Sequence, residues 1–248
     1  MDWQDDGIIL GARRHGETSV ILEAMTRGHG RHLGLVKGGR SRRLAPTLQP
    51  GNAVALRWRA RLEEHLGFFS AEPMRLRAAA LMEAPASLHG LNLVAGLLRL
   101  LAEREPNEVL FDLADDALDT LGDRQRAPAL LVRFEMELLA ASGFGLDLAS
   151  CAATGRSDDL VWVSPRSGRA VSREAGAPYR EKLLPLPDFL RDGAADRPRD
   201  GNAPPLADLL AGFKLTGFFL HRDLTAPRNA SLPPAREAYL ALLRHEAG

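Results

Sequence analysis

The sequence is poor in cysteine and in long apolar runs, and both shortages exclude classes of protein. Cys151 is the single cysteine among 248 residues, so no disulfide can form within the chain, as is usual in a reducing cytosol. The longest apolar runs are far too short to cross a bilayer. The N-terminal residues lack the basic and apolar regions of a signal peptide. We therefore expect a cytoplasmic protein that does not enter a membrane.

Lysine is scarce as well, and nearly all of the 32 basic residues are arginine. Arginine binds phosphate through paired hydrogen bonds and stacks on bases, which favours a nucleic acid as partner. Codon bias in a GC-rich genome would also raise the arginine content, so arginine usage alone decides little. The apolar fraction of 45% and charged fraction of 26% are typical of a globular protein, and the length suggests two or more domains.

The formal net charge of zero hides a strong asymmetry. Residues 1–80 hold 13 Lys/Arg and 8 Asp/Glu, a balance of +5. Residues 81–150 hold 5 and 12, a balance of −7, and residues 151–248 hold 14 and 12, a balance of +2. The basic N-terminal segment (1–80) and the acidic central segment (81–150) therefore indicate regions with separate roles.

The densest cationic stretch runs from residue 27 to residue 43 and contains no Asp or Glu. Glycines before and after its apolar centre are typical of tight turns and of loops that a ligand can approach closely. Because the block repels itself, we expect an anion against it, and phosphate is the commonest such partner. A solubilising surface hairpin is the alternative.

Five short apolar segments predict strands at residues 7–10, 18–25, 33–36, 53–61 and 66–70, with a basic turn at Arg13-Arg14. In the fourth segment Arg57, Arg59 and Arg61 share one face, while the other face, with Trp58, is apolar. One of Phe68 and Phe69 should point outward, where it could touch a base. Five strands in this length predict an OB-type barrel, with an SH3-like barrel as alternative.

From residue 85 the apolar period changes to three or four, which predicts helices at 85–102, 108–121 and 128–142. Asn107 is the expected N-cap of the second helix, whose Asp-rich side is interpreted as a solvated face. A hairpin is predicted at 160–171, a loop at 193–205, and helices at 206–224 and 234–243. The predicted fold class is α+β, with these domains: a barrel (1–80), a helical domain (81–150), a hairpin module (151–192), and a loop with C-terminal helices packing on the helical domain (193–248).

The ordered set of motifs resembles the RecO family of bacterial recombination mediators. The residues that carry the resemblance cover roughly 7–150: Gly16-Glu-Thr-Ser19, Thr26-Arg-Gly-His-Gly30, Val36-Lys-Gly-Gly39, Leu48-Gln-Pro-Gly51, Leu66-Gly67, Leu110-Phe111, Phe134-Glu135, Leu138-Leu139 and Gly143-Phe-Gly-Leu-Asp147. Gly217-Phe-Phe-Leu220 and Pro233-Pro-Ala-Arg236 add looser support. The resemblance implies a protein of DNA repair, associated with the nucleoid, that binds single- and double-stranded DNA and anneals complementary strands. It also implies that RecR is a partner and that the two help load RecA onto strands covered by single-strand-binding protein.

The family's small zinc module uses two pairs of cysteines. Here the first pair aligns with Cys151-Ala-Ala-Thr154 and the second with Ser172-Arg-Glu-Ala175, so three of four ligands are absent. A structural zinc needs four ligands, and no histidine lies between His89 and His221. We therefore expect no zinc and no other cofactor, with the hairpin kept as a metal-free remnant.

The basic residues of the barrel are the candidate DNA contacts, and they would bind phosphates without base specificity. They are Arg13, Arg14, Arg27, Arg31, Lys37, Arg40, Arg42, Arg43, Arg57, Arg59 and Arg61. Around the third predicted helix, Arg124, Arg126 and Arg133 are candidates for the acidic, apolar tail of single-strand-binding protein, although ordinary surface arginines are an equal alternative.

Two rival functions belong to other classes. An enzyme is disfavoured because no phosphate-binding loop or dinucleotide fingerprint is present, and His15, His29 and His32 have only Glu17 and Glu23 as nearby carboxylates. We expect no catalytic residue. An RNA-binding or ribosome-associated OB-barrel protein is the second alternative, and structured RNA as the preferred ligand would favour it.

Overall fold

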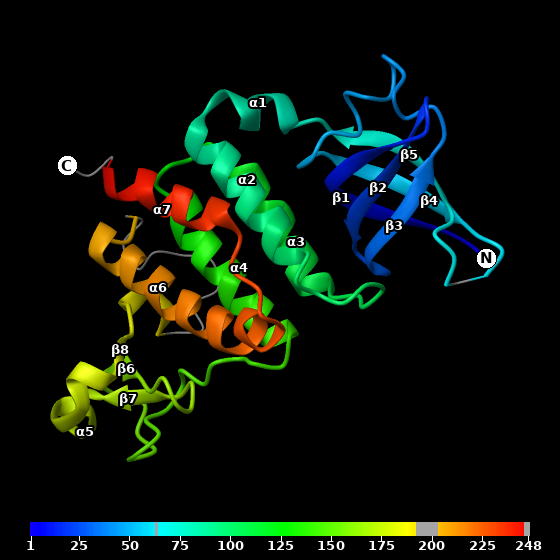
Figure 1. The fold of residues 1–248 in the computed structure, drawn as a ribbon. Helices are drawn as coiled ribbons and strands as arrows, with labels where there is room; N and C mark the ends of the chain where they lie inside the picture. The colour runs from blue at the N-terminus through cyan, green and yellow to red at the C-terminus, as the bar shows by residue number, and fades with distance from the viewer. Residues whose placement is uncertain (63, 192–202, 246–248) are drawn as a thin grey trace. The chain divides into compact units, whose positions relative to one another are not determined.

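Five strands of the N-terminal region close into a barrel in the computed structural model of the chain (Figure 1). They are β1 (Asp2–His15), β2 (Ser19–Thr26), β3 (Gly30–Val36), β4 (Ala53–Arg59) and β5 (Phe68–Arg75). The order around the barrel is β1-β2-β3-β5-β4. Neighbouring strands are antiparallel except for β3 and β5, which are parallel. A closed five-stranded barrel of this kind confirms the predicted OB-type fold.

The barrel core follows the period-2 pattern of its strands. Trp58 is 1% exposed and packs in one cluster with Ile9, Leu22 and Val54. Phe69 is buried, whereas its neighbour Phe68 is 47% exposed. Successive side chains point to opposite faces of a strand, so the sequence predicted a buried Trp58 and one exposed residue of the two phenylalanines, and the structure shows that the exposed one is Phe68.

Two strand boundaries differ from the prediction. β1 begins at Asp2 and contains Arg13 and Arg14, so the predicted turn at these arginines is wrong, and the chain turns at residues 16–18. The polar start of β1 pairs with β4 and its later part with β2, so backbone pairing extends the strand beyond its apolar run. β5 likewise continues through Pro73, opposite an irregularity in β4.

The structure describes residues 1–62, 64–191 and 203–245, and the chain forms two units, Met1–Gly122 and Asp123–Gly248. The N-terminal unit holds the barrel, α1 (Ala78–Glu83), α2 (Pro85–Leu98) and α3 (Glu108–Thr120). The predicted helical domain therefore supplies helices to both units, and the boundaries of the four predicted domains stay predictions. No helix in these described ranges combines the length and the apolar character needed to span a membrane.

The start of α3 confirms the predicted cap, because the Asn107 side chain accepts a hydrogen bond of 2.8 Å from the Leu110 backbone N–H. The prediction of a solvated acidic face on this helix is wrong in part. Asp112 pairs with Arg27, and Asp115 and Asp119 both pair with Arg75 and Arg77. The acidic helix thus neutralises arginines of the barrel and of the segment that follows it.

The C-terminal unit is a helical group with a small sheet. It contains α4 (Ala127–Ala141), β6 (Leu160–Val163), β7 (Ala170–Ser172), α5 (Arg173–Gly176), β8 (Leu184–Pro185), α6 (Leu206–Phe219), a π-helical turn (Leu220–Thr225) and α7 (Pro234–His245), with short 3₁₀ turns at Ala177–Lys182, Asp188–Leu190 and Ala226–Arg228. β6 and β7 confirm the predicted hairpin, and β8 adds a strand too short to predict. The predicted loop at 193–205 falls mostly outside the described residues.

A buried ion pair holds the helices of this unit together. Glu135 of α4 is fully buried and accepts two hydrogen bonds from Arg236 of α7, at 2.8 and 3.0 Å, and a third from Thr216 of α6. Both charges are withdrawn from water, so each needs the other, and removal of one alone is strongly destabilising. These bonds fix α6 and α7 against α4.

Candidate nucleic-acid interface

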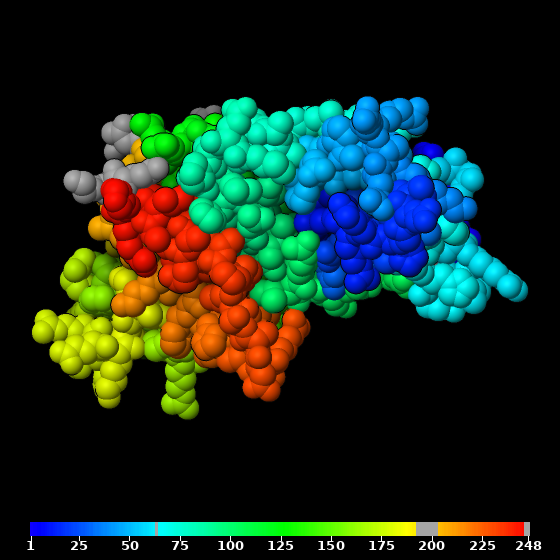
Figure 2. All heavy atoms as spheres, turned by 45° about the horizontal axis from the view of Figure 1, so that its top comes forward, coloured from blue at the N-terminus to red at the C-terminus, as the bar shows by residue number. Residues whose placement is uncertain are grey.

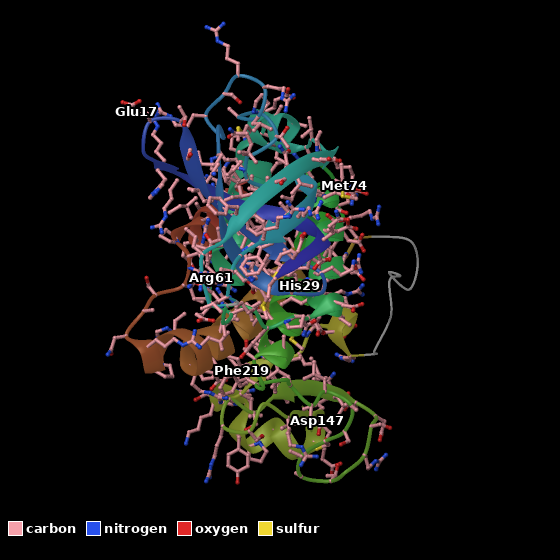
Figure 3. The ribbon with its side chains drawn as sticks, turned by 90° about the vertical axis from the view of Figure 1, so that its right-hand side faces the viewer. Glu17, His29, Arg61, Met74, Asp147 and Phe219 are labelled. Carbon is pink, nitrogen blue, oxygen red and sulfur yellow. The ribbon has the colours of Figure 1, made fainter. Side chains whose placement is uncertain are left out.

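Two loops form a cationic end of the barrel. The turn between β1 and β2 lies beside the segment that follows β3, because the Arg40 backbone N–H donates to the Thr18 carbonyl at 3.0 Å. The Arg40 guanidinium also donates to the carbonyl of Glu17, which Figure 3 labels at this end of the barrel. These contacts gather six exposed cations, here called the cationic edge: Arg13, Arg14, Lys37, Arg40, Arg42 and Arg43.

The cationic edge is available to an anion. Among the described residues, none of its six side chains forms an ion pair with a carboxylate. Lys37 instead lies over the exposed ring of Phe68, with Nζ 4.7 Å from the ring centroid. In such an arrangement the cation can contact the phosphate of a nucleotide, and the aromatic ring can stack on its base.

The arginines of β4 have a different environment. Asp2 of β1 lies opposite Arg59 and accepts hydrogen bonds from Arg57 Nη2 at 2.6 Å and from Arg59 Nε at 2.9 Å. The bond from Arg57 is the main reason that the pKa of Asp2 falls to about 2. The carboxylate is therefore ionised at neutral pH and offsets part of the positive charge. Arg61, beyond the end of β4, is exposed.

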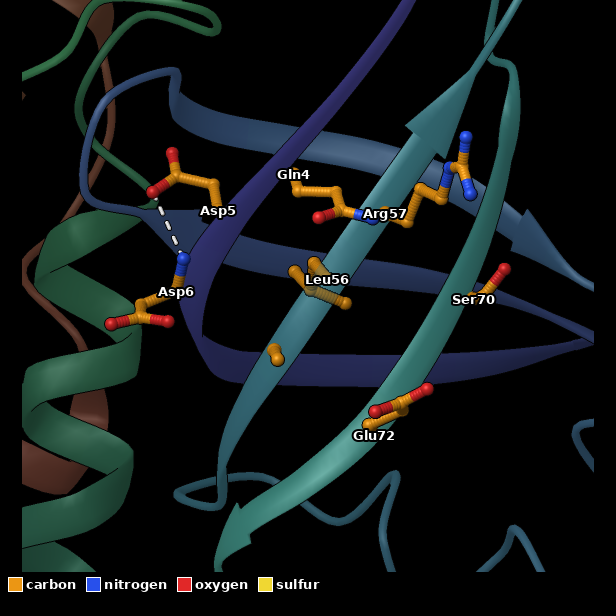
Figure 4. Close-up of a pocket in the computed structure, with 8 residues that line it drawn as sticks. Gln4, Asp5, Asp6, Leu56, Arg57, Ser70 and Glu72 are labelled. Carbon is orange, nitrogen blue, oxygen red and sulfur yellow. Dashed lines mark hydrogen bonds between the residues drawn. The ribbon is translucent and has the colours of Figure 1, made fainter.

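The same face of β1, β4 and β5 contains a hollow of about 490 Å³ (Figure 4). Acidic and basic side chains meet around it, because Asp6 and Glu72 lie near Arg57. Figure 4 shows Ser70 and Glu72 along β5 and Arg57 on β4. A face of mixed charge is less suited to a run of phosphates than the cationic edge.

Arg27 and Arg31 are used inside the N-terminal unit. Arg31 binds Glu23 at 2.8 Å and donates from Nε to the Leu101 carbonyl, with only 15% of its side chain exposed. Arg27 pairs with Asp112 and lies over the ring of Phe111. Both belong to the turn end of the β2–β3 hairpin, six residue steps along the ladder from the cationic edge. The structure thus brings six of the eleven predicted DNA contacts together in the cationic edge. The other five lie elsewhere on the barrel, two at the turn end of the hairpin and three on or just beyond β4.

Apolar side chains cover part of the outer face of this hairpin, beside the Glu23 carboxylate, which binds Arg31 and Arg99. Ile21, Leu33 and Leu35 are half-buried on its outer face, and a hollow of about 450 Å³ there also touches Arg13. The space-filling view shows the surface of these N-terminal strands in blue (Figure 2).

The three arginines predicted for a protein tail lie in the C-terminal unit. Arg124 and Arg126 are exposed before α4, and Arg133 is half-buried on that helix. Nothing in the structure distinguishes them from ordinary surface arginines, and their role stays a prediction.

The hairpin of the C-terminal unit gathers the remnants of the predicted zinc site. Cys151 Sγ is 3.5 Å from Ser172 Oγ and accepts a bond of 3.3 Å from the Ser172 N–H. Burial raises the pKa of Cys151, but hydrogen bonds from Ser172 and Thr154 together outweigh burial and lower it to about 6. One thiolate with two hydroxyls does not fit a structural zinc, which needs four Cys, His or carboxylate ligands. Across the described ranges, no group of three or more His, Cys, Asp or Glu could hold a metal ion.

A closed OB-type barrel with a cationic edge, followed by helices and a small hairpin, defines a class of barrel proteins suited to nucleic acids. The sequence matches the family descriptions "Recombination protein O N terminal" over residues 1–77 and "Recombination protein O C terminal" over residues 85–233. The chain therefore belongs to the RecO family, which confirms the resemblance found in its motifs.

Relatives align along almost the whole chain. The DNA repair protein RecO of Methylocella silvestris is 58% identical over 241 residues, which is 97% of this chain and 95% of the relative. The DNA repair protein RecO of Methylobacterium nodulans is 54% identical over 248 residues, 100% of both chains. That of Rhizobium etli is 55% identical over 241 residues, 97% of this chain and 91% of the relative.

The sequence did not predict an aromatic pocket that the structure places at one end of the barrel. Trp3, His29 and Arg104 line a further pocket of the barrel, and only Trp3 had a usable signal. Trp3 alternates with Asp2 and Gln4 along β1, which would have placed it on the inner face had the strand been recognised from its start. Arg104 comes from the loop before α3, so no local pattern connects it to the barrel.

Proposed function

We propose that this protein is a DNA-binding recombination mediator of DNA repair. Its full-length relatives are named for DNA repair and its family for recombination. The observation that carries the proposal is the cationic edge, whose six basic side chains are exposed and lack carboxylate partners among the described residues. In this role it anneals complementary single strands and, with RecR, helps load RecA onto DNA covered by single-strand-binding protein.

The mechanism is electrostatic and needs no catalytic residue. Cations at the edge neutralise phosphates and release condensed counterions, so affinity falls steeply as salt rises. Two strands held on the same basic surface repel each other less, which lets pairing nucleate. DNA binding of this kind does not depend on the base sequence, because every nucleotide carries the same phosphate group.

Two further parts of the proposal concern the C-terminal unit and the place of action. Arg124, Arg126 and Arg133 offer cations to the acidic tail of single-strand-binding protein. The hairpin keeps its fold without zinc, through the hydrogen bonds of Cys151. A protein with these ligands acts at the DNA of the nucleoid.

Two double variants with the same loss of charge test the role of the cationic edge. We expect Arg42→Ser/Arg43→Ser to reduce the salt dependence of single-strand binding by about 1.4 in the log–log slope, roughly 0.7 for each phosphate that is no longer neutralised. Arg57→Ser/Arg59→Ser should change it much less, because Asp2 already offsets these arginines. Fluorescence anisotropy of a labelled oligonucleotide across a salt series measures both slopes.

The matched pair separates location from total charge. Both variants lower the net charge by two, so a general charge effect would change the two slopes equally. Equal slopes, or a larger effect on β4, would contradict the assignment to the cationic edge. Absence of binding by the wild-type protein at low salt would refute DNA binding itself.

A further inference from the structure

A further pocket of the barrel, separate from the two hollows described above, lies at the turn end of the β2–β3 hairpin. Its volume is about 500 Å³, within the range of small-molecule sites. Four of its lining side chains are aromatic, namely Trp3, His29, His32 and Trp58. Figure 3 labels His29 at the end of the barrel away from Glu17. The role of the cationic edge leaves this pocket without an assigned function.

Three of these rings form a series that reaches the surface. The Trp58 and Trp3 centroids are 5.6 Å apart with planes inclined by 19°, and those of Trp3 and His29 are 4.1 Å apart with planes inclined by 8°. Trp58 belongs to the core, whereas 37% of the His29 side chain is exposed. The series therefore ends in an aromatic face that solvent can reach.

The orientation of His29 is fixed by Asp5. The Asp5 carboxylate lies 2.8 Å from His29 Nδ1 and also accepts a 2.8 Å bond from the Gly28 N–H. Asp5 is on β1, two residues from Trp3. This strand therefore supplies both the Trp3 ring on which His29 stacks and the carboxylate that orients His29. A face that is held in place loses little side-chain entropy when a ligand stacks on it.

Arg104 provides a cation at the rim of the pocket. Its φ of +66° is a backbone conformation that non-glycine residues rarely adopt. The Arg104 N–H donates to the Arg31 carbonyl at 2.9 Å, and the guanidinium donates to the His65 carbonyl at 3.3 Å. The loop is thus held against the hairpin in a conformation that sets this side chain beside the aromatic rings.

We propose that this pocket binds one unpaired nucleobase of a DNA strand, which stacks on the exposed face of His29 while Arg104 contacts the edge of that base. The inference rests on the proposed function and deepens it. Every base has a π-face, so stacking is compatible with binding that ignores sequence. A base inside a duplex cannot enter the pocket, and the pocket therefore favours single strands.

The cationic edge and the pocket can act on the same strand. The ladder between them runs from Val20 opposite Val36 to Thr26 opposite Gly30, about 20 Å at the usual rise of a strand. The half-buried Ile21, Leu33 and Leu35 lie along this path, together with the Glu23 carboxylate, which Arg31 and Arg99 neutralise. A single strand that begins at the edge could follow the hairpin and place a base in the pocket.

Abasic DNA separates the two sites. An oligothymidylate and an abasic oligonucleotide of equal length carry the same phosphates, but only the first has bases. We expect the wild-type protein to bind the first about tenfold more tightly at matched salt. His29→Ala and, separately, Arg104→Gly should reduce this ratio several-fold and leave abasic binding nearly unchanged. Glycine adopts the φ of Arg104 readily, so this variant keeps the loop.

His15→Ala is the matched control, since His15 is an exposed histidine of β1 outside the pocket. It should keep the wild-type ratio. Equal affinity of the wild-type protein for both oligonucleotides, or an unchanged affinity ratio in His29→Ala, would refute the proposal that the pocket binds a base. Salt-dependent binding of the abasic strand would still support the cationic edge, so the two proposals fail separately.

Photocrosslinking locates the base directly. An oligonucleotide with 5-iododeoxyuridine crosslinks to aromatic side chains on which the base stacks, and mass spectrometry of the digested protein identifies the residue. Adducts on His29 or Trp3 are the expected result. Adducts confined to Phe68 would place the base at the cationic edge and refute the proposal.

Discussion

At the scale of single residues, carboxylates decide which arginines remain for DNA. Asp2 binds Arg57 and Arg59, Glu23 binds Arg31, and a residue of α3 binds Arg27. None of these pairs connects neighbours in sequence, so composition could not reveal them. The exposed cations of the edge differ from Arg27, Arg31, Arg57 and Arg59 in lacking such a partner among the described residues, and Arg61 shares this feature but lies apart from the edge.

His32 makes the stability of the N-terminal unit depend on pH. The ring is 3% exposed, between Trp58 and Phe69, and burial lowers its pKa. Arg104 and His29 act in the same direction, while Glu103 opposes them. Below about pH 6.5 the unfolded chain therefore takes up a proton that the folded ring refuses. The free energy of unfolding should fall from pH 7.5 to pH 5.5, by up to about 1.4 kcal/mol per pH unit.

Urea unfolding followed by tryptophan fluorescence measures this dependence. His32→Gln cannot titrate and should flatten the curve in this pH window, while His65→Gln, at an exposed position, should leave it as in the wild type. If the wild-type protein and His32→Gln lost stability equally on acidification, another group would be responsible.

At the scale of elements, hairpins carry the functional features of the barrel. The β2–β3 hairpin joins the cationic edge to the aromatic pocket, and the end of β1 supplies Arg13 and Arg14. In the hairpin of β6 and β7, Cys151 is hydrogen-bonded to both the side chain and the backbone of Ser172, which supports the expectation that this element folds without a metal.

Metal removal should therefore have no effect on this hairpin. We expect elemental analysis of the purified protein to find no stoichiometric zinc, and a strong chelator to leave the midpoint of thermal unfolding unchanged. The reason is that one thiolate and two hydroxyls supply too few zinc ligands. One zinc per chain, or a lower midpoint in chelator, would contradict the expectation.

At the scale of the whole molecule, charge is divided between functions. Acidic residues of α3 pair with arginines of the N-terminal unit, and the cationic edge retains its positive charge for a ligand. The C-terminal unit supplies the arginines proposed for a protein partner. The proposed mediator role needs both kinds of contact, because in that role the DNA is covered by single-strand-binding protein.

Annealing of complementary oligonucleotides tests the complete proposal. The wild-type protein should accelerate annealing of bare strands and of strands coated with single-strand-binding protein, and the acceleration should fade as salt rises. Arg124→Glu/Arg126→Glu/Arg133→Glu should lose the effect on coated strands and keep it on bare strands. Fluorescence quenching between labelled strands follows the reaction.

The contrary outcomes of the annealing experiment point to different errors. Binding without annealing would leave a general DNA-binding barrel, and unchanged activity of the triple variant would remove the tail assignment. A strong preference for structured RNA over single-stranded DNA at matched salt would favour the RNA-binding alternative.

The sequence by itself determined the barrel, the principal helices and the hairpin. Periodicity predicted that Trp58 is buried and that one of Phe68 and Phe69 is exposed, and Asn107 carried a local capping signal. These features depend on residues close in sequence, because strand alternation, helical period and caps act over a few positions.

Only the tertiary structure decided which cations are available and what surrounds them. Asp2 lies 55 residues from Arg57, and the loop of Arg104 lies far along the chain from the rings of Trp3 and His29. Their pairing depends on strand register and on the path of loops, which are set by packing of the whole unit. The cationic edge and the aromatic pocket therefore became separate sites only when the barrel was closed.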